Sequence, residues 1–431
     1  MNLMTSREQK SSKPEGHGDR LSPLGWFFPV RSRVTRWHEG HAITLLETGD
    51  EFFPALCAAI DAATTSIHLE TYIFRLDETG QRVLSHLLQA AARKVRVRVV
   101  LDGFGSAEHA AIICSRLKAG GAQCRIYRPE PARWLRYLPL PSRLRRLHRK
   151  ITSVDDRLAF IGGINMEDDC AGQAAGSDGG RPWLDFAVQV EGSVVQEMVS
   201  AQEIVWLQMN HPRFFQRFRR WVFNRRNRQE RCSSPPQGTS LRVAFLIRDN
   251  LRHRHTIEAA YLTAIKAARV EILLANAYFL PGRRIRRALM NAAQRGVRVQ
   301  LLLQGRIEYP LQHRATRWLY QQFIQAGVEI YEYLPSYLHA KVAVVDRLAT
   351  VGSSNLDAFS LLLAREANLL IDDAKFSGRL RTSLNRAIDR GGRLIEPTPY
   401  ALGNGWMRLV DWSAYWLLRL GVVLTGKGRG Y

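Results

Sequence analysis

The order of apolar and polar positions alternates along the chain between short β-type runs and longer stretches with helical periodicity. β-branched and other apolar residues are dense over residues 67–74 and 95–103, with a helix-period stretch between them. Residues 272–279 and 297–305 show the same succession, and the second run of each half ends at a glycine. This alternation predicts α/β units whose sheets are largely buried.

The second half of the chain repeats the first at a period of about two hundred residues, far longer than the period of a solenoid. Ala59-Ile60-Asp61-Ala62-Ala63 precedes the first strand, and Ala264-Ile265-Lys266-Ala267-Ala268 precedes its counterpart. The duplication predicts two similar lobes, each a mostly buried β-sheet flanked by helices. The expected organisation is a disordered tail over 1–40, a first lobe over 41–226, a polar linker over 227–240, a second lobe over 241–399 and a C-terminal segment over 400–431.

Each half also contains a histidine, a lysine two positions later and an aspartate after four further residues, followed by a glycine-containing turn that ends in asparagine. The first copy is His148, Lys150 and Asp155, with Asn165 ending the turn. The second copy is His339, Lys341 and Asp346, with Ser353 and Asn355 in the turn. Two such matches at equivalent places exclude coincidence.

The spacing has a physical reason, because residues two apart on a strand project to the same face. Two lobes brought together would place two imidazoles and two ammonium groups around one cavity, which suits a phosphate. One imidazole can attack phosphorus while the other transfers the proton of the leaving or entering alcohol. The lysines neutralise the phosphate oxygens, so we expect neither a metal nor another cofactor. Only 9 of the 62 cationic residues are lysine, so lysine in both motifs points to a need for a compact charge.

Acidic residues further along complete the parallel between the halves. Asp185 and Glu366 are placed to hold the far nitrogen of each histidine, which would fix its tautomer and stabilise its cation. We count Asp155 and Asp346 with the catalytic motif, and for both we favour pairing with lysine or backbone in a supporting role over direct catalysis.

The paired strings resemble the signature of the phospholipase D superfamily. From about Thr44 to Asp389 the chain is most similar to bacterial cardiolipin synthases of the B type, in stretches such as Leu69-Glu70-Thr71-Tyr72-Ile73-Phe74 and Gly352-Ser353-Ser354-Asn355-Leu356-Asp357. The resemblance implies a pseudo-twofold active site and transfer of a phosphatidyl group between two phosphatidylglycerol molecules through a phosphohistidine, with release of glycerol. It assigns His148 as the nucleophile, although symmetry permits either histidine, and it assigns substrate contacts to Asn165, Ser353 and Asn355.

Charge and aromatic residues together predict an anionic phospholipid membrane as partner. The formal net charge is +23, and arginine alternates with aromatic residues over 131–146 and 206–228. Three tryptophans fall within residues 406–424, where interior charges favour lying in the membrane surface over crossing it. Packing against the protein remains the alternative for each segment. Five scattered cysteines without a C-x-x-C pair predict a reducing compartment and no disulfide framework, so we expect a peripheral protein on the cytoplasmic side of the cell membrane.

Other functions stay open at this point. A phospholipase D-type phosphodiesterase could hydrolyse phospholipid or nucleic acid, and a silent relative could bind membranes without turnover. Nucleic acid is not expected as a partner, because the basic segments are interleaved with apolar residues at amphipathic spacing. Phosphatidylethanolamine could replace one phosphatidylglycerol as donor, and the oligomeric state is left undetermined.

Overall fold

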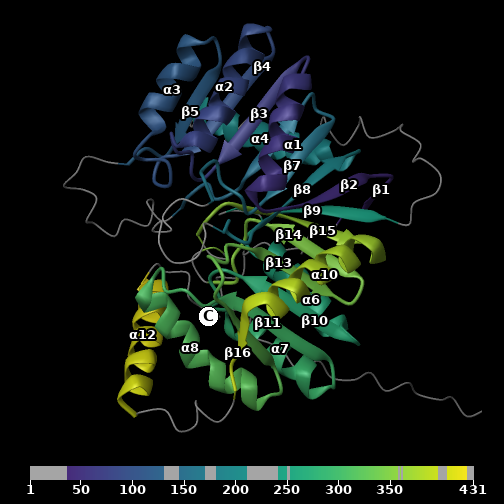
Figure 1. Ribbon diagram of the computed structural model, residues 1–431, viewed down its shortest axis with the longest axis vertical. Coiled ribbons are helices and arrows are strands. Elements are labelled where there is room, and N and C mark those ends of the chain that lie inside the picture. The colour runs from purple at the N-terminus through teal and green to yellow at the C-terminus, as the bar shows by residue number, and fades with distance from the viewer. Residues whose placement is uncertain are drawn as a thin grey trace, which may run out of the picture. The chain divides into compact units, whose positions relative to one another are not determined.

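Two mixed β-sheets, one from each half of the chain, form the framework of the computed structural model (Figure 1). All residues that it describes belong to one compact unit, Thr35–Tyr431. The described residues are 36–130, 145–169, 181–210, 241–249, 253–357, 360, 363–396 and 405–424.

The first sheet has the strand order β2-β8-β7-β6-β3-β4-β5, in which β3, β4 and β5 are parallel and the other pairs antiparallel. Helices α1, α2 and α3 pack in one apolar core with this sheet, and α4 packs in a separate core. The elements are β2 (Ala42–Glu47), α1 (Thr48–Ala62), β3 (Ser66–Thr71), α2 (Glu78–Ala92), β4 (Arg96–Asp102), α3 (Ala110–Ala119), β5 (Gln123–Tyr127), β6 (Ile151–Val154), β7 (Leu158–Gly162), β8 (Phe186–Glu191) and α4 (Val194–Asn210).

The second sheet contains the order β9-β15-β14-β13-β10-β11-β12, which matches the first sheet strand for strand and confirms the duplicated α/β fold. Strands β1 and β16 extend it at its two edges. The elements are β1 (His38–Glu39), β9 (Arg242–Arg248), α6 (Thr256–Ala267), β10 (Glu271–Asn276), α7 (Arg283–Gln294), β11 (Arg298–Gln304), α8 (Pro310–Gln325), β12 (Glu329–Tyr333), β13 (Lys341–Val345), β14 (Leu348–Gly352), β15 (Glu366–Asp372), α10 (Ala374–Gly391), β16 (Gly392–Leu394) and α12 (Gly405–Leu424).

Strand β1 comes from the N-terminal end of the described chain but belongs to the sheet of the second lobe. His38 pairs with Val243 and Glu39 with Arg242, both in antiparallel register. The predicted disordered tail over 1–40 therefore extends too far, because these two residues find an edge strand to pair with. Residues 1–35 and the predicted linker over 227–240 lie outside the described residues.

One apolar core is shared by the two lobes. Ile161 and Val188 of the first sheet pack in the same cluster as Val342, Val351 and Leu369 of the second. Helices α4 and α10 close this cluster with side chains such as Met198 and Leu380, which are fully buried. The lobes are therefore joined by burial of apolar surface, the largest favourable contribution to folding.

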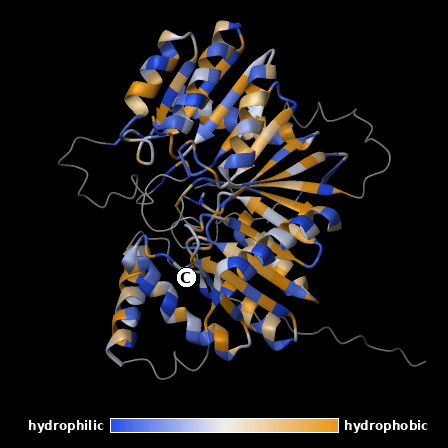
Figure 2. Ribbon diagram, viewed as in Figure 1, coloured by the Kyte–Doolittle hydropathy of each residue, from blue (hydrophilic) through white to orange (hydrophobic). Residues whose placement is uncertain are grey.

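The C-terminal helix α12 lies along α8 (Figure 1). Its inner face buries Ala414 and Tyr415, and Asp411 pairs with Arg314 of α8 at 3.3 Å. Its outer face exposes many large apolar side chains, and Figure 2 shows both hydrophobic and hydrophilic positions along the helix. The exposed large apolar residues of α12 are Trp406, Met407, Leu409, Trp412, Trp416, Leu417 and Leu420. Among the described helices, none combines the length and the apolar character that crossing a membrane requires.

The other two basic, aromatic segments contribute little to the described surface. Residues 131–144 and 211–228 lie outside the described residues. Trp206 is buried at the end of α4, with the guanidinium of Arg125 4.1 Å from its ring centroid. Trp206 thus packs inside the first lobe and does not face a membrane.

The cysteine pattern predicts no disulfide framework, and the structure contains one disulfide bond that this prediction did not foresee. Cys114 of α3 and Cys124 of β5 are bonded to each other. Helix α3 packs on β5 and brings the two Cα atoms to 5.1 Å, within the range that a disulfide spans. Cysteine spacing along the sequence could not show this, because the contact depends on the turn between the two elements.

The motif aspartates form the turns of equivalent β-hairpins. Asp155 follows β6 and Asp346 follows β13, each with φ of 53°. The Asp155 carboxylate accepts the backbone N–H groups of residues 64–66 at 2.8–2.9 Å. The Asp346 carboxylate accepts those of residues 269–271 at 2.9–3.0 Å. Each aspartate therefore fastens a hairpin to the start of the neighbouring strand.

We expect Asp155→Asn to lower the free energy of unfolding by about 1–2 kcal/mol, because an amide offers one acceptor atom where the carboxylate uses two. Urea denaturation followed by circular dichroism measures the change. Asp156→Asn is the matched control, since Asp156 is its exposed neighbour with a similar φ of 52°. Equal stability of the two variants would contradict the fastening role.

Candidate active site

The two His-x-Lys pairs stand at the entrances of equivalent strands. His148 and Lys150 directly precede β6, and Lys341 is the first residue of β13, two residues after His339. The side chains of His148 and His339 are 15% and 14% exposed, so both rings remain accessible. Lys150 and Lys341 are buried behind them.

Backbone bridges between the lobes hold each histidine next to the other lobe. The N–H of His148 donates to the carbonyl of Arg365 at 3.0 Å, and the N–H of His339 donates to that of Leu184 at 2.9 Å. Arg365 and Leu184 are the residues immediately before the two predicted histidine-orienting acids. The structure thus brings both halves of the motif to one place.

The histidine side chains pair across the lobes in the same way. Nδ1 of His148 lies 3.0 Å from Oε1 of Glu366, and Nδ1 of His339 lies 2.6 Å from Oδ2 of Asp185. A carboxylate on Nδ1 fixes the tautomer that leaves the Nε2 lone pair free. Each lobe therefore supplies one imidazole and the acid that orients the imidazole of its partner.

The lysines fold back toward their own histidines. Nζ of Lys150 donates to the carbonyl of His148 at 3.0 Å and lies 3.3 Å from Nε2 of the same residue. Nζ of Lys341 donates to the carbonyl of His339 and lies 3.7 Å from Asp185. Two ammonium groups thus border the same site as the two imidazoles.

Burial and mutual repulsion weaken the protonated forms of these groups. Desolvation and the charge of Lys341 lower the pKa of Lys150 to about 7. Desolvation and Lys341 also lower the pKa of His339 to about 4, although Asp185 acts in the opposite direction. The pKa values of His148 and Lys341 are lowered too, chiefly by desolvation. An anion bound between Lys150 and Lys341 would offset the repulsion between their ammonium groups.

Two polar residues of the glycine-containing turns, Ser353 and Asn165, lie near the histidines. Oγ of Ser353 donates to Glu366 at 2.5 Å, and the Ser353 carbonyl lies 3.2 Å from Nδ1 of His148. Nδ2 of Asn165 donates to Glu167 at 2.9 Å. Asn165 and Asn355 are both buried, and within the described chain the amide oxygen of each lacks a hydrogen-bond partner. Unmatched buried polar atoms at this place are suited to a polar ligand.

Asp155 and Asp346 are not among the groups gathered here. Strands β6 and β13 separate them from Lys150 and Lys341, a span of about 16 Å over five extended residues. Their carboxylates are occupied by backbone N–H groups at the far end of those strands. The catalytic assignment of these two residues therefore has no support in their position.

Sequence reasoning overlooked two aromatic residues next to the histidines. The ring centroid of Tyr72 lies 4.7 Å from that of His148, and the centroid of Trp183 lies 5.8 Å from that of His339. Nζ of Lys150 also stands 5.3 Å from the Tyr72 centroid. Tyr72 follows strand β3 and Trp183 stands two residues before Asp185, and those positions were the available signals.

Charged residues at the site also went unnoticed. Glu167 is buried two residues beyond Asn165, and Nε of Arg75 pairs with it at 3.1 Å. Glu308 of the second lobe accepts from the Tyr278 hydroxyl at 2.7 Å. Across the described part of the chain, no three His, Cys, Asp or Glu side chains are grouped to hold a metal ion.

Comparison with known proteins places this geometry in a family. A family model described as "Cardiolipin synthase, PLD-like domain" matches residues 56–172 and 261–388, one stretch in each lobe. Cardiolipin synthase B of Salmonella typhi is 39% identical over 392 residues, which covers 90% of this chain and 91% of that protein. Cardiolipin synthase B of Escherichia coli (strain K12) is 37% identical over the same length and coverage.

A solved structure shares the fold. The crystal structure of phosphatidylserine synthase from Haemophilus influenzae Rd KW20 matches with a TM-score of 0.64 at 16% identity, covering 90% of this chain and 94% of that one. Two lobes of equal strand order that meet at paired His-x-Lys motifs define a protein of the phospholipase D class. Within that class, the chain belongs to the family of PLD-like cardiolipin synthases and is a phosphatidyltransferase.

Because the pKa of Lys150 is lowered in the empty site, we expect the protein to take up a proton when an anion binds. Diethyl phosphate, a diester without a titration near neutral pH, should raise the pKa of Lys150 from about 7 toward its ordinary value of 10.5. We therefore expect proton uptake on binding at pH 8, where the empty site holds mostly neutral Lys150. Isothermal titration calorimetry in buffers of different ionisation enthalpy measures it.

The matched variants separate this lysine from the others. Lys150→Met should remove most of the uptake at pH 8, whereas Lys118→Met, which changes an exposed lysine of helix α3, should leave it unchanged. A binding heat of the wild-type protein that does not depend on the buffer would contradict the linkage.

Proposed function

We propose that this chain is a cardiolipin synthase that transfers a phosphatidyl group from one phosphatidylglycerol to another and releases glycerol. The observation that carries the proposal is the cross-lobe pairing of His148 with Glu366 and of His339 with Asp185. Two imidazoles, each held by a carboxylate at Nδ1, stand beside two buried lysines and provide a nucleophile, an acid–base group and charge for one phosphodiester. Family membership supports the lipid substrate.

In the first step, Nε2 of His148 attacks phosphorus and a phosphohistidine bond forms. The bond from phosphorus to the glycerol oxygen breaks, and that oxygen takes a proton from the His339 imidazolium. Asp185, 2.6 Å from Nδ1 of His339, stabilises that cation before it gives up the proton. Lys150 and Lys341 neutralise the non-bridging oxygens as charge builds on them.

In the second step, a hydroxyl of the acceptor phosphatidylglycerol attacks the phosphohistidine. Its proton passes to His339, the new oxygen–phosphorus bond forms, and the bond to His148 breaks. The enzyme is thereby restored with cardiolipin as product. Asn165 lines a cavity with His339, and the buried amides of Asn165 and Asn355 are proposed to orient the phosphate oxygens, with Ser353 holding Glu366 in place.

Incubation of the full chain with phosphatidylglycerol in detergent and a chelator should yield cardiolipin and glycerol, detected by mass spectrometry. His148→Ala and His339→Ala should each lower the rate by at least about 10³-fold, because neither step proceeds without both imidazoles. His109→Ala, at the start of helix α3, is the control that retains activity. Activity that survives either motif substitution would contradict the mechanism, and phosphatidic acid as the main product would favour hydrolysis.

We also propose that α12 holds the enzyme peripherally on an anionic membrane. The helix is fastened to α8 through Asp411 and to Arg286 of α7 through the Tyr415 hydroxyl, so its exposed tryptophans stand on a fixed face. Arg419 lies 5.5 Å from the Trp416 centroid and so accompanies the apolar face with a cation. Such a face suits the headgroup layer, where rings enter the interface and cations meet lipid phosphates.

We propose that the protein lies on the cytoplasmic side of the cell membrane, and this proposal rests on its charge alone. The Cys114–Cys124 disulfide removes the argument that scattered cysteines indicate a reducing compartment. The chain carries 62 Lys and Arg against 39 Asp and Glu. The anionic cytoplasmic leaflet attracts such an excess.

Replacing Trp406, Trp412 and Trp416 together with serine should lower binding to phosphatidylcholine vesicles containing phosphatidylglycerol roughly tenfold or more, through the lost apolar transfer. Vesicle flotation measures the bound fraction. Ile112→Gln, which changes an exposed apolar residue on α3, should leave binding unchanged. Undiminished flotation of the triple variant would contradict anchoring by α12.

A further inference from the structure

A cavity of about 220 Å³ opens on His339 where the lobes meet. The first lobe lines it with Arg75, Glu167 and Trp183, and the second lobe with Glu308 and Tyr337. One water needs roughly 10–15 Å³ of such space, so the cavity accommodates a polar group of several atoms. A group bound there would lie next to the imidazole of His339.

Neighbouring side chains position the carboxylates of the two glutamates that line this cavity. Glu167 receives Nδ2 of Asn165 at 2.9 Å on one oxygen and Nε of Arg75 at 3.1 Å on the other. Each carboxylate oxygen can accept a second hydrogen bond, so Glu167 can still accept hydrogen bonds from a ligand. Burial raises the pKa of Glu167, and Arg75 opposes that shift.

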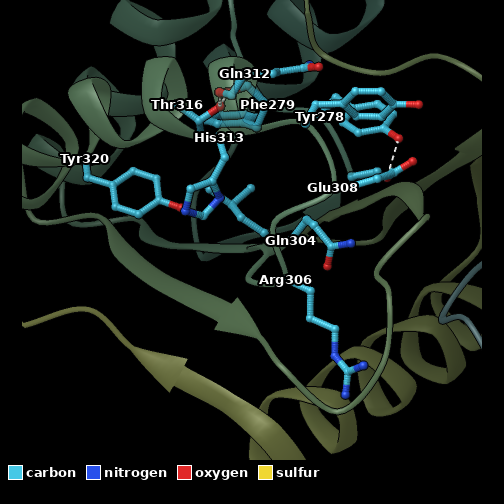
Figure 3. A pocket seen from close by; sticks show the side chains of 12 residues that line it. Tyr278, Phe279, Gln304, Arg306, Glu308, Gln312, His313, Thr316 and Tyr320 are labelled. Atoms are coloured by element: carbon cyan, nitrogen blue, oxygen red, sulfur yellow. Dashed lines mark hydrogen bonds between the residues drawn. The ribbon is translucent and has the colours of Figure 1, made fainter. Parts of the chain in front are cut away.

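Glu308 is the second acceptor, on the opposite lobe. Figure 3 shows the Tyr278 hydroxyl bonded to it, at 2.7 Å, beside a smaller pocket that extends toward His313 and Thr316. That pocket measures about 30 Å³, enough for one or two waters only. Glu308 lines both spaces, and only the larger one reaches His339.

Unmatched polar atoms mark the same place. Nε1 of Trp183 is buried and, among the described residues, has no hydrogen-bond partner. The amide oxygen of buried Asn165 is in the same state and lines a small adjoining cavity with Trp183 and Glu167. The rings of Trp183 and Tyr337 lie 5.8 Å apart and provide an apolar wall. A ligand with both donors and acceptors on a short carbon chain would satisfy this set.

We propose that this cavity is the alcohol subsite, which holds the glycerol head group as it leaves and then the hydroxylated head group of the acceptor lipid. The inference rests on the proposed function and names the residues that would select its alcohol. Neutral hydroxyls can donate to Glu167 and Glu308 and accept from Trp183. An ammonium group only donates, so it would leave the indole N–H of Trp183 without an acceptor.

The subsite also separates the roles of the two histidines. The leaving oxygen must lie opposite the attacking nitrogen and within reach of the acid that protonates it. An alcohol held beside His339 makes His339 the proton donor in the first step and the proton acceptor in the second. His148 then forms and loses the bond to phosphorus, so each step balances within the pair.

Head-group exchange tests the subsite. Phosphatidylglycerol in detergent is offered deuterated glycerol and 1-propanol at equal concentrations, and the exchanged lipids are counted by mass spectrometry. The wild-type enzyme should prefer glycerol, and Glu167→Gln with Glu308→Gln should lower the glycerol-to-propanol ratio roughly tenfold while propanol exchange persists. Trp183→Phe keeps the ring, removes the N–H and should lower the ratio less.

Glu108→Gln, an exposed glutamate before α3, is the control that should keep the wild-type ratio. Equal losses with both alcohols, or an unchanged ratio in every variant, would overturn the subsite. Preference of the wild-type enzyme for ethanolamine over glycerol would overturn it in favour of a cation site. A wild-type enzyme that makes no cardiolipin and exchanges no alcohol contradicts the proposed function as well, whereas cardiolipin synthesis with an unchanged ratio contradicts the subsite alone.

Discussion

The backbone bridges between the lobes are the constraint on which the site depends. His148 is tied to Arg365 and His339 to Leu184, and in each case the next residue of the other lobe is the acid that holds the imidazole. The register of two short parallel bridges therefore sets both histidine–carboxylate contacts at once. The shared apolar core holds the sheets in the position that this register needs.

This arrangement places several basic groups in a poorly solvated space. With no anion present, their charged forms repel one another, and the pKa values of Lys150 and His339 fall to about 7 and about 4. A phosphodiester would restore the charges that the proposed mechanism uses, including the proton on His339. Binding and activation would then be one event, because the substrate supplies the field that charges its own acid catalyst.

The sequence predicted the fold well because strand and helix periodicities repeat in both halves, and the repeated strand order confirms it. It indicated Asp185 and Glu366 through their equivalent positions, but it could not show that each serves the opposite lobe. The spacing of Asp155 and Asp346 in the motif suggested chemistry, whereas both complete hairpins through backbone contacts. Trp183 and Glu167 lie in the first copy and Glu308 lies in the second. These residues come together only in the folded structure, so no repeated pattern marks them as one group. The Cys114–Cys124 disulfide could not be predicted from the sequence either, because it depends on how α3 packs on β5.

The reciprocal exchange of acids between the lobes has a consequence for descent. A single ancestral lobe would have carried an imidazole without its acid, and a two-fold homodimer would have completed both sites by symmetry. Fusion of two such copies into one chain would preserve the contacts between each histidine and the acid of the other lobe. It would also allow each copy to change independently. An aspartate now serves one histidine and a glutamate the other, and the copies differ in the rings beside them. In the proposed mechanism, this duplicated pair of histidines carries out two different tasks.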